Sequence, residues 1–194
     1  MLLEADSPGV ERYAFHTMGV RGTKFGGFKL NNVKVLVENL VGRENEGFPM
    51  MMGIFDILRN YAALSTVGAA EKALELAIER AKSRILFGWP LGKFEDIQFR
   101  IAEDYTLLQA AKLLAYRALW KANRGEYIAL DTAMAKWFCV EAALKAADDA
   151  IQIHGAIGYT SEFPVERIYR DVRGINFGDG TPQIMLSLIH ISEP

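Results

Sequence analysis

Residues 48 to 83 contain no proline after Pro49 and are rich in alanine, leucine, glutamate and lysine, which favour helices. Residues 95 to 123 repeat apolar side chains at helical spacing, at Ile97, Ile101, Leu108 and Leu114. Residues 128 to 153 do so every three or four positions, at Met134, Trp137, Val140, Leu144, Ala147 and Ile151. The pattern predicts three long antiparallel helices packed as a bundle, with one apolar stripe along the third helix.

Glycine and proline mark the ends of these helices. Residues 84 to 94 are expected to form a loop, and residues 155 to 163 another. Pro164 can open a short fourth helix, because its missing N–H costs nothing in the first turn. A glycine-rich turn is expected at residues 174 to 180. The predicted fold class is therefore mainly α, an antiparallel helical bundle.

The first forty or so residues differ from the rest in composition. They are rich in glycine and in residues that favour strands, and short strands are expected around Phe28, Leu30, Val33, Val35 and Val37. A few strands cannot form a stable sheet alone. We expect residues 1–42 to be the end of a β domain whose earlier strands are missing, and residues 43–185 to be the helical bundle.

The last nine residues, LSLIHISEP, are the direct translation of a common transposon sequencing adapter. We therefore expect residues 186–194, His190 included, to be adapter-encoded and to have no functional role. The alternative is a natural amphipathic tail.

Composition and charge exclude several functions. The chain has 22 basic and 24 acidic residues and a net charge of −2, which gives no electrostatic case for binding nucleic acid or an anionic membrane. No apolar run approaches the roughly 20 residues of a membrane span. The single Cys139 cannot form an internal disulfide, which favours a reducing compartment such as the cytoplasm. No residue spacing typical of a metal site is present.

Three segments carry residues suited to chemistry, and each has a structural alternative. Asp179 lies between two glycines, so its carboxylate can approach a ligand closely, but Asp-Gly is also common in turns. Arg84, followed by Phe87 and Gly88, suits a pyrophosphate and an aromatic ring, but can equally be a cation at a helix C-terminus. Gln152 to Gly155 can contact a heteroaromatic edge, or simply end the third helix.

Taken together and in this order, these segments resemble the acyl-CoA dehydrogenase family from about Leu2 to Met185. The motifs that carry the resemblance are Met18-Gly19-Val20-Arg21-Gly22, Asn39-Leu40-Val41-Gly42, Arg84-x-x-Phe87-Gly88-x-Pro90, Gln152-Ile153-His154-Gly155, Pro164-Val165-Glu166-Arg167 and Gly180-Thr181. The resemblance implies the end of the family's middle β domain followed by its C-terminal helical domain. It also implies FAD as cofactor and an acyl-CoA thioester as substrate, oxidised between its α and β carbons.

The resemblance assigns roles residue by residue. Asp179 takes the position of the catalytic base, and Asp56, Arg59 and Gly180 take positions that contact substrate, with Arg59 holding the CoA part. The positions that contact FAD are matched by Arg84, Phe87, Gln152, Gly155, Thr181 and Gln183. In this family the first four reach the FAD of a neighbouring subunit, which implies a homotetramer. An electron-transfer flavoprotein is the implied electron acceptor.

The sequence departs from the family in its base. The base is aspartate rather than glutamate, and Gly178 replaces the bulky aromatic residue usual before it, which predicts a wider cavity. Both departures favour a ring-bearing or α-branched acyl group, and some relatives that oxidise alicyclic acyl-CoAs also use aspartate. The family's alternative base position on the first helix is Leu58, so no second base is expected.

Two other functions remain open. One is a flavin oxidase of the same fold that acts on a non-CoA carbon acid, since nitroalkane oxidases resemble this family and use aspartate. The other is a non-catalytic helical interaction module. The family's N-terminal domain and the first half of its β domain have no counterpart in the sequence, so we expect the chain alone to be inactive.

Overall fold

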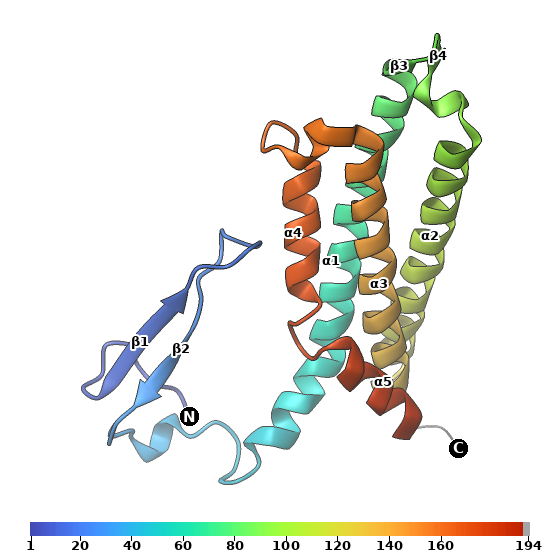
Figure 1. Cartoon of the computed structure of the whole chain (residues 1–194). Coiled ribbons are helices and arrows are strands. Elements are labelled where there is room, and N and C mark those ends of the chain that lie inside the picture. The colour runs from blue at the N-terminus through green and yellow to red at the C-terminus, as the bar shows by residue number, and fades with distance from the viewer. Residues whose placement is uncertain (192–194) are drawn as a thin grey trace.

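The computed structural model describes residues 1–191, and the last three residues of the adapter-like segment lie outside the described part. A β-hairpin precedes a helical bundle (Figure 1). The helices of the described part are α1 (Gly47–Ser83), α2 (Glu95–Asn123), α3 (Ala129–His154), α4 (Val165–Ile175) and α5 (Pro182–Ile191). The mainly helical fold class and the three long helices expected from the sequence are confirmed. The last helix, α5, was not expected.

α3 is the central helix and packs against α1, α2, α4 and α5. Its buried face is lined by alanine, at positions 135, 142, 143, 146, 147 and 150, and meets buried alanines of α1 and α2. Small side chains let neighbouring helices approach closely. Of the expected stripe, Val140 and Ala147 are buried, Leu144 and Ile151 are half-buried and pack against the core, and Met134 and Trp137 are half-buried. Because other helices surround α3, its small residues lie where the neighbouring helices come closest, and its larger side chains lie at the edges of these contacts.

The segment expected as a loop between α1 and α2 is more ordered than predicted. Strands β3 (Ile85–Leu86) and β4 (Trp89–Pro90) form a small antiparallel hairpin, followed by a 3-10 turn at Leu91–Lys93. The two residues that join the strands, Phe87 and Gly88, have φ of +51° and +85°, as a tight hairpin turn requires.

Strands β1 (Val10–Phe15) and β2 (Phe25–Leu30) form the N-terminal antiparallel hairpin, with Val10 opposite Leu30 and Phe15 opposite Phe25. The strand expectation holds for Phe28 and Leu30. It is wrong for Val33 and Val35, because within residues 1–191 no strand pairs with that segment. Val37 begins a 3-10 turn, Val37–Asn39.

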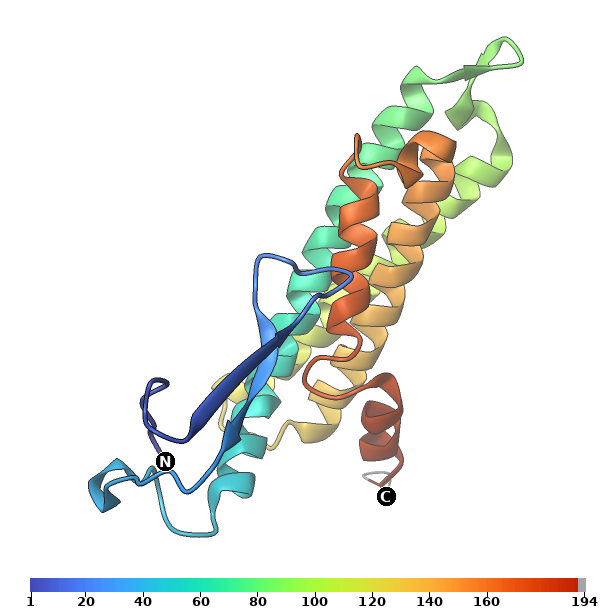
Figure 2. The ribbon, with the colours of Figure 1, turned by 60° about the vertical axis from the view of Figure 1, so that its left-hand side comes forward.

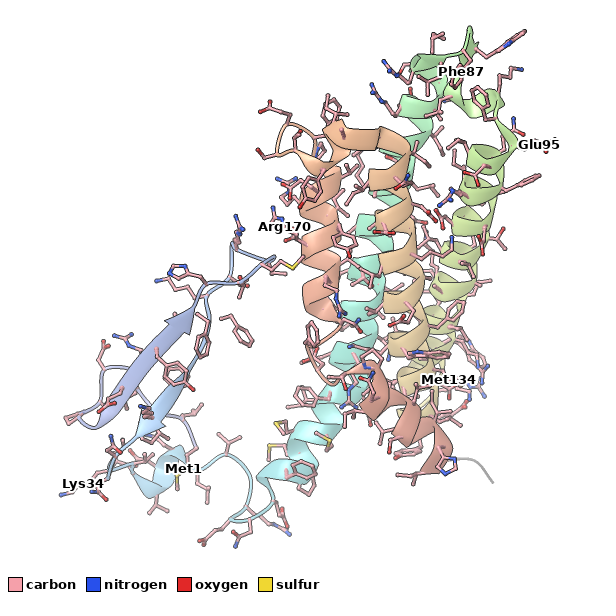
Figure 3. The ribbon with its side chains drawn as sticks, viewed as in Figure 1. Met1, Lys34, Phe87, Glu95, Met134 and Arg170 are labelled. Carbon is pink, nitrogen blue, oxygen red and sulfur yellow. The ribbon has the colours of Figure 1, made fainter. Side chains whose placement is uncertain are left out.

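The loop that joins β1 and β2 lies against α4 (Figure 2). The backbone N–H of Val20 donates to Asp171 Oδ1 at 2.6 Å, and Arg170 Nη1 donates to the Met18 carbonyl at 2.5 Å. Arg170 lies on the side of α4 that faces this loop (Figure 3). A side chain at Gly19 would overlap the Arg170 carbonyl, so glycine allows this close approach.

None of the described helices is both long and apolar enough to span a bilayer.

Candidate active site

Asp179 lies in the turn that connects α4 to α5. Its φ is +56°, in the left-handed region that aspartate tolerates better than most residues, and the φ of Gly180 is +110°. The positive φ of Gly180 favours glycine; a Cβ there would lie 2.8 Å from Met185 Cε, a flexible end that can shift. The Asp-Gly pair is therefore held in a backbone conformation that few other sequences adopt.

Two buried cations, one from α1 and one from α3, hold this turn by its backbone. Arg59 Nε donates to the Asp179 carbonyl at 2.8 Å. Lys136 Nζ donates to the carbonyls of Gly180 at 2.7 Å, Ile175 at 3.0 Å and Asn176 at 3.4 Å. Lys136 is only 1% exposed and Arg59 only 6%. The carbonyl of Asp179 is thus held by a residue of α1, and the carbonyl of Gly180 by a residue of α3.

The carboxylate of Asp179 is left without a partner in the described residues. Neither a hydrogen bond nor an ion pair within 4 Å engages its side chain in residues 1–191. Burial lowers the pKa of Lys136 to about 8, against the opposing effect of the nearby Asp179 charge. The arrangement orients the residue through its main chain and leaves its carboxylate available to accept a proton.

Arg59 is also supported by neighbours on α1. Its guanidinium lies 5.3 Å from the centre of the Phe55 ring and 3.9 Å from Asp56 Oδ1. Burial raises the pKa of Asp56, and the charge of Arg59 partly offsets that effect. The Asp56 carbonyl accepts hydrogen bonds from Asn60 and Thr132, which tie α1 to α3 beside the turn. Arg59, expected to contact CoA, thus has its Nε committed to the chain itself.

An apolar cavity of about 410 Å³ lies beside the turn, between the β1–β2 loop and α4. Its lining includes Met18, Val20, Phe25, Phe177 and Gly178. The missing side chain at Gly178 leaves this wall of the cavity open. Gly178 lines this cavity, whereas Asp179, the next residue, does not.

Thr181 and Gln183 lie at the start of α5. Thr181 Oγ1 accepts a hydrogen bond from the Ile184 N–H at 3.5 Å, in the manner of a helix N-cap, and Pro182 is the first helical residue. Gln183 is exposed in the first turn of α5. The structure therefore brings Asp56, Arg59, Asp179, Gly180 and Thr181 together at one end of the bundle, with Gln183 beside them.

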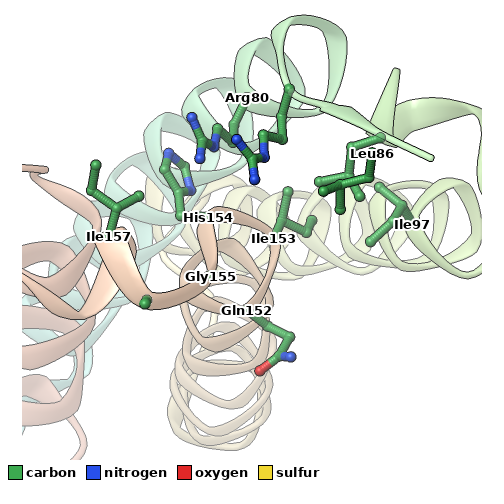
Figure 4. Close-up of a pocket in the computed structure, with 11 residues that line it drawn as sticks. Arg80, Leu86, Ile97, Gln152, Ile153, His154, Gly155 and Ile157 are labelled. Carbon is green, nitrogen blue, oxygen red and sulfur yellow. The ribbon is translucent and has the colours of Figure 1, made fainter. Parts of the chain in front are cut away.

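The other predicted cofactor residues lie at the opposite end of the bundle, around a second cavity of about 360 Å³. Arg84, Gln152 and Gly155 line it, together with Arg80 and His154. Arg80 lies beside His154 on one side, and Leu86 and Ile97 are on the other (Figure 4). His154 Nδ1 donates to the Ala150 carbonyl at 2.7 Å, as expected for a satisfied histidine.

Charge makes this second cavity suitable for an anionic ligand. Within residues 1–191 neither Arg80 nor Arg84 has a carboxylate within 4 Å, and Arg80 Nε is buried without a hydrogen-bond partner. Guanidinium groups in this state fit a phosphate or pyrophosphate. Phe87 does not line the cavity; it is 91% exposed at the tip of the β3–β4 hairpin (Figure 3).

Sequence reasoning missed two of these residues. Lys136 shares a helical face with Ala133, Val140 and Ala143, and a lysine at such spacing among small apolar residues is a signal for a buried ammonium. Arg80 lies one helical turn before Arg84, which places both guanidinium groups on the same face. In residues 1–191 no cluster of His, Cys, Asp or Glu is arranged to hold a metal.

The structure is a helical bundle with an aspartate-bearing turn at one end and a cavity lined by two arginines at the other. Residues 45–192 match the family described as acyl-CoA dehydrogenase, C-terminal domain. The chain belongs to the acyl-CoA dehydrogenase family, which confirms the resemblance drawn from its motifs. The match extends into the segment suspected to be adapter-encoded, and α5 also runs through it.

The chain is similar to several known proteins over nearly all its length. It is 39% identical to a 3-(aryl)acrylate reductase of Clostridium sporogenes, covering 89% of this chain and 46% of the relative. It is 37% identical to a subunit of a caffeyl-CoA reductase–Etf complex of Acetobacterium woodii, covering 90% and 46%. The butyryl-CoA dehydrogenase structure from Megasphaera elsdenii superposes with a TM-score of 0.94 at 34% identity, covering 98% of this chain and 50% of that one. The chain spans about half the length of these relatives.

Proposed function

We propose that this chain forms the base-bearing part of an FAD-dependent acyl-CoA dehydrogenase in which Asp179 removes the α proton of the substrate. The observation that carries the proposal is the Asp179 turn, whose main chain is bound by Arg59 and Lys136 while its carboxylate stays free. The adjoining apolar cavity supports the same assignment, since it can exclude water from the acyl group.

The chemistry explains why a positioned carboxylate is needed. An α proton beside a thioester is weakly acidic, so the base must lie within hydrogen-bond reach of it, and the developing enolate oxygen needs donors. The backbone N–H of Asp179 is one such donor by analogy with the family. FAD, when bound, accepts the hydride from the β carbon.

The substrate class follows from the short base and the open cavity wall. Aspartate is one methylene shorter than glutamate, and an offset on the order of 1 Å can cost about 100-fold in rate. We therefore propose a ring-bearing or α-branched acyl group, which brings its α carbon closer to Asp179 and fills the space beside Gly178. The 3-(aryl)acrylate named for the C. sporogenes relative is an example of a ring-bearing acyl group.

The two ends of the bundle suggest that one chain contributes to two FAD molecules. Lys136 and Gln152 are 152 − 136 = 16 residues apart on α3, which corresponds to about 24 Å along the helix. We propose that Thr181 and Gln183 contact the chain's own FAD, and that Arg84, Phe87, Gln152 and Gly155 contact the FAD of a neighbour. This supports a homotetramer, and the relative in an Etf complex supports an electron-transfer flavoprotein as acceptor.

The test uses the complete gene that contains this chain. The enzyme is mixed without oxygen with straight-chain, alicyclic and aryl-bearing acyl-CoAs while flavin absorbance is followed. Wild type should bleach, Asp179→Ala should lose at least 100-fold in rate, and Asp148→Ala, an exposed aspartate on α3, should behave as wild type. Unimpaired bleaching by Asp179→Ala would remove this residue from the role of base.

A flavin oxidase that acts on a non-CoA carbon acid remains the second candidate. Arg59 would argue for CoA if its guanidinium were free, but its Nε is bonded to the Asp179 carbonyl, so it does not separate the two functions. Bound FAD without bleaching by any thioester, together with reduction by a nitroalkane, would favour the oxidase. Absence of FAD from the complete protein would instead favour a helical interaction module.

We also propose that residues 186–194 are encoded by adapter DNA. An independent clone settles this point. Different native codons after Met185 would support the proposal, and the same nine residues would contradict it.

A further inference from the structure

Lys136 is an unusual residue to find inside a bundle. Its side chain is 1% exposed and its helix face is otherwise made of alanine and other small residues. Burying an ammonium group is unfavourable unless its hydrogen bonds are replaced. Within residues 1–191 it forms no ion pair within 4 Å, and its partners are three backbone carbonyls.

Part of this arrangement has a purely structural explanation. Ile175 is the last residue of α4 and Asn176 follows it, so their carbonyls are among those that a helix leaves unpaired at its C-terminus. A cation there is also favoured by the helix dipole. However, the shortest contact of Lys136, 2.7 Å, is to Gly180, which lies beyond the end of α4.

The Gly180 contact has a different consequence. Asp179 and Gly180 both have positive φ, and their carbonyls are bound separately by Arg59 and Lys136. Two donors from two helices therefore hold two successive peptide units, 179–180 and 180–181, directly after the Asp179 Cα, and so restrict the backbone that carries the Asp179 side chain.

We propose that Lys136 is a positioning residue for the base: by binding the carbonyls of Ile175, Asn176 and Gly180 it fixes the Asp179 carboxylate relative to the substrate's α carbon. The proposal rests on the proposed function of Asp179. The charges that face Lys136 are Asp179, Arg59 and Glu141. Because Lys136 binds carbonyls rather than the carboxylate, it orients the base without forming an ion pair with it.

The first experiment measures the turn directly, without activity. Backbone hydrogen exchange is recorded for the 194-residue chain as wild type, Lys136→Met and Lys145→Met. Lys145 is the control because it is a lysine of the same helix that binds Asp104 and Asp149 on the α2 side. Lys136→Met should exchange at least ten-fold faster in residues 175–181 alone. Lys145→Met should accelerate exchange only as far as it lowers the stability of the whole chain, and should not accelerate residues 175–181 selectively.

The second experiment measures flavin reduction by acyl-CoA in the complete enzyme. Lys136→Met should lower the limiting rate 10- to 100-fold with little change in KM, since a displaced base slows proton removal more than binding. Lys136→Arg, which restores the charge and the N–H donors, should recover part of the rate. Lys145→Met should retain the wild-type rate at temperatures where it is folded.

The outcomes separate this inference from the proposed function. If wild type bleaches and Asp179→Ala does not, Asp179 stands as the base, and a wild-type rate or wild-type exchange in Lys136→Met overturns the role of Lys136. An equal loss of rate in Lys145→Met would also overturn it, by showing a general effect of stability. Should Lys136→Met not fold, Lys136→Gln, which keeps an N–H donor, is judged by the same criteria.

Discussion

The protonation of the buried Lys136 side chain affects the free energy of unfolding of the chain. Burial lowers its pKa from 10.5 to about 8. Between these pH values the unfolded chain binds more protons than the folded chain at this position. The free energy of unfolding therefore gains a contribution as pH rises from about 8 toward 10.5.

This predicts a pH difference between wild type and Lys136→Met. From pH 7.5 to 9.5 the stability of wild type should improve relative to the variant, because only wild type carries the buried ammonium that loses its proton. Urea unfolding of both chains, followed by circular dichroism at each pH, provides the measurement. Parallel pH profiles would mean that the folded-state pKa of Lys136 is close to its ordinary value.

At the scale of elements, α2 and α3 are joined by a charge cluster. Lys145 binds Asp104 at 2.9 Å, Asp149 at 2.8 Å and Glu103 at 3.2 Å, and Asp149 also binds Arg100 at 2.6 Å. Burial raises the pKa of Asp104, which is 1% exposed, and Lys145 partly offsets this. The Asp104 charge thus depends on Lys145.

Lys145→Met should consequently destabilise the chain by roughly 3 kcal/mol, because it leaves buried Asp104 without its cation. Asp104→Asn in the same background should recover part of the loss, since the amide carries no charge. Urea denaturation of the single and double variants at pH 7 compares them. A double variant no more stable than the single one would show that the buried charge is not the cause.

Sequence patterns predicted where the helices begin and end better than they predicted which side of each helix is buried. Stretches of helix formers, interrupted by proline only at Pro49, located α1, α2 and α3 to within two residues at each end. Periodicity alone could not predict which side of α3 is most buried, because α1, α2, α4 and α5 all pack against this helix. The closest contacts are made by its small residues, which the apolar pattern does not single out. The sequence did not predict α5, although Thr181 and Pro182 form a recognisable helix start, because only the four residues from Pro182 to Met185 precede the adapter-like segment.

The candidate site shows the same limit. Motifs identified Asp179, Arg84 and Gln152, which differ strongly from their surroundings in the sequence. Lys136 contacts residues far from it in the sequence. Arg80 is noticed only because it lines the same cavity as Arg84. Both relations depend on how the helices pack. The motif also predicted that Phe87 contacts the cofactor, but Phe87 does not line the cavity that Arg84, Gln152 and Gly155 line.

At the scale of the whole molecule, the separation of the two sites predicts two separable phenotypes. In the complete enzyme Arg84→Ala should raise the Kd for FAD by about 10- to 100-fold, since a charged hydrogen bond contributes roughly 1.5–3 kcal/mol. Arg124→Ala, an arginine paired with Glu126 at the other end of α2, is the matched control. FAD retained after ultrafiltration is the measured quantity, and equal retention in both variants would remove Arg84 from the cofactor site.

The chain alone should bind FAD weakly or not at all and should not turn over. It spans half the length of the Megasphaera structure that it matches, and the family resemblance implies that the main contacts to the flavin ring lie in the other half. Purification of the 194-residue chain, followed by an absorbance spectrum, tests this. Stoichiometric yellow flavin would contradict it.

The hydrogen bonds to the main chain at the Asp179 turn affect how the residue at position 179 can change in evolution. Arg59 and Lys136 bind carbonyl oxygens, which every amino acid has, so they do not distinguish one side chain at position 179 from another. What limits the choice there is the positive φ, which aspartate, asparagine and glycine tolerate best. Substitution among these residues can therefore alter or remove the reacting group while its main-chain support stays intact, so the chemistry of this turn can change without a new fold.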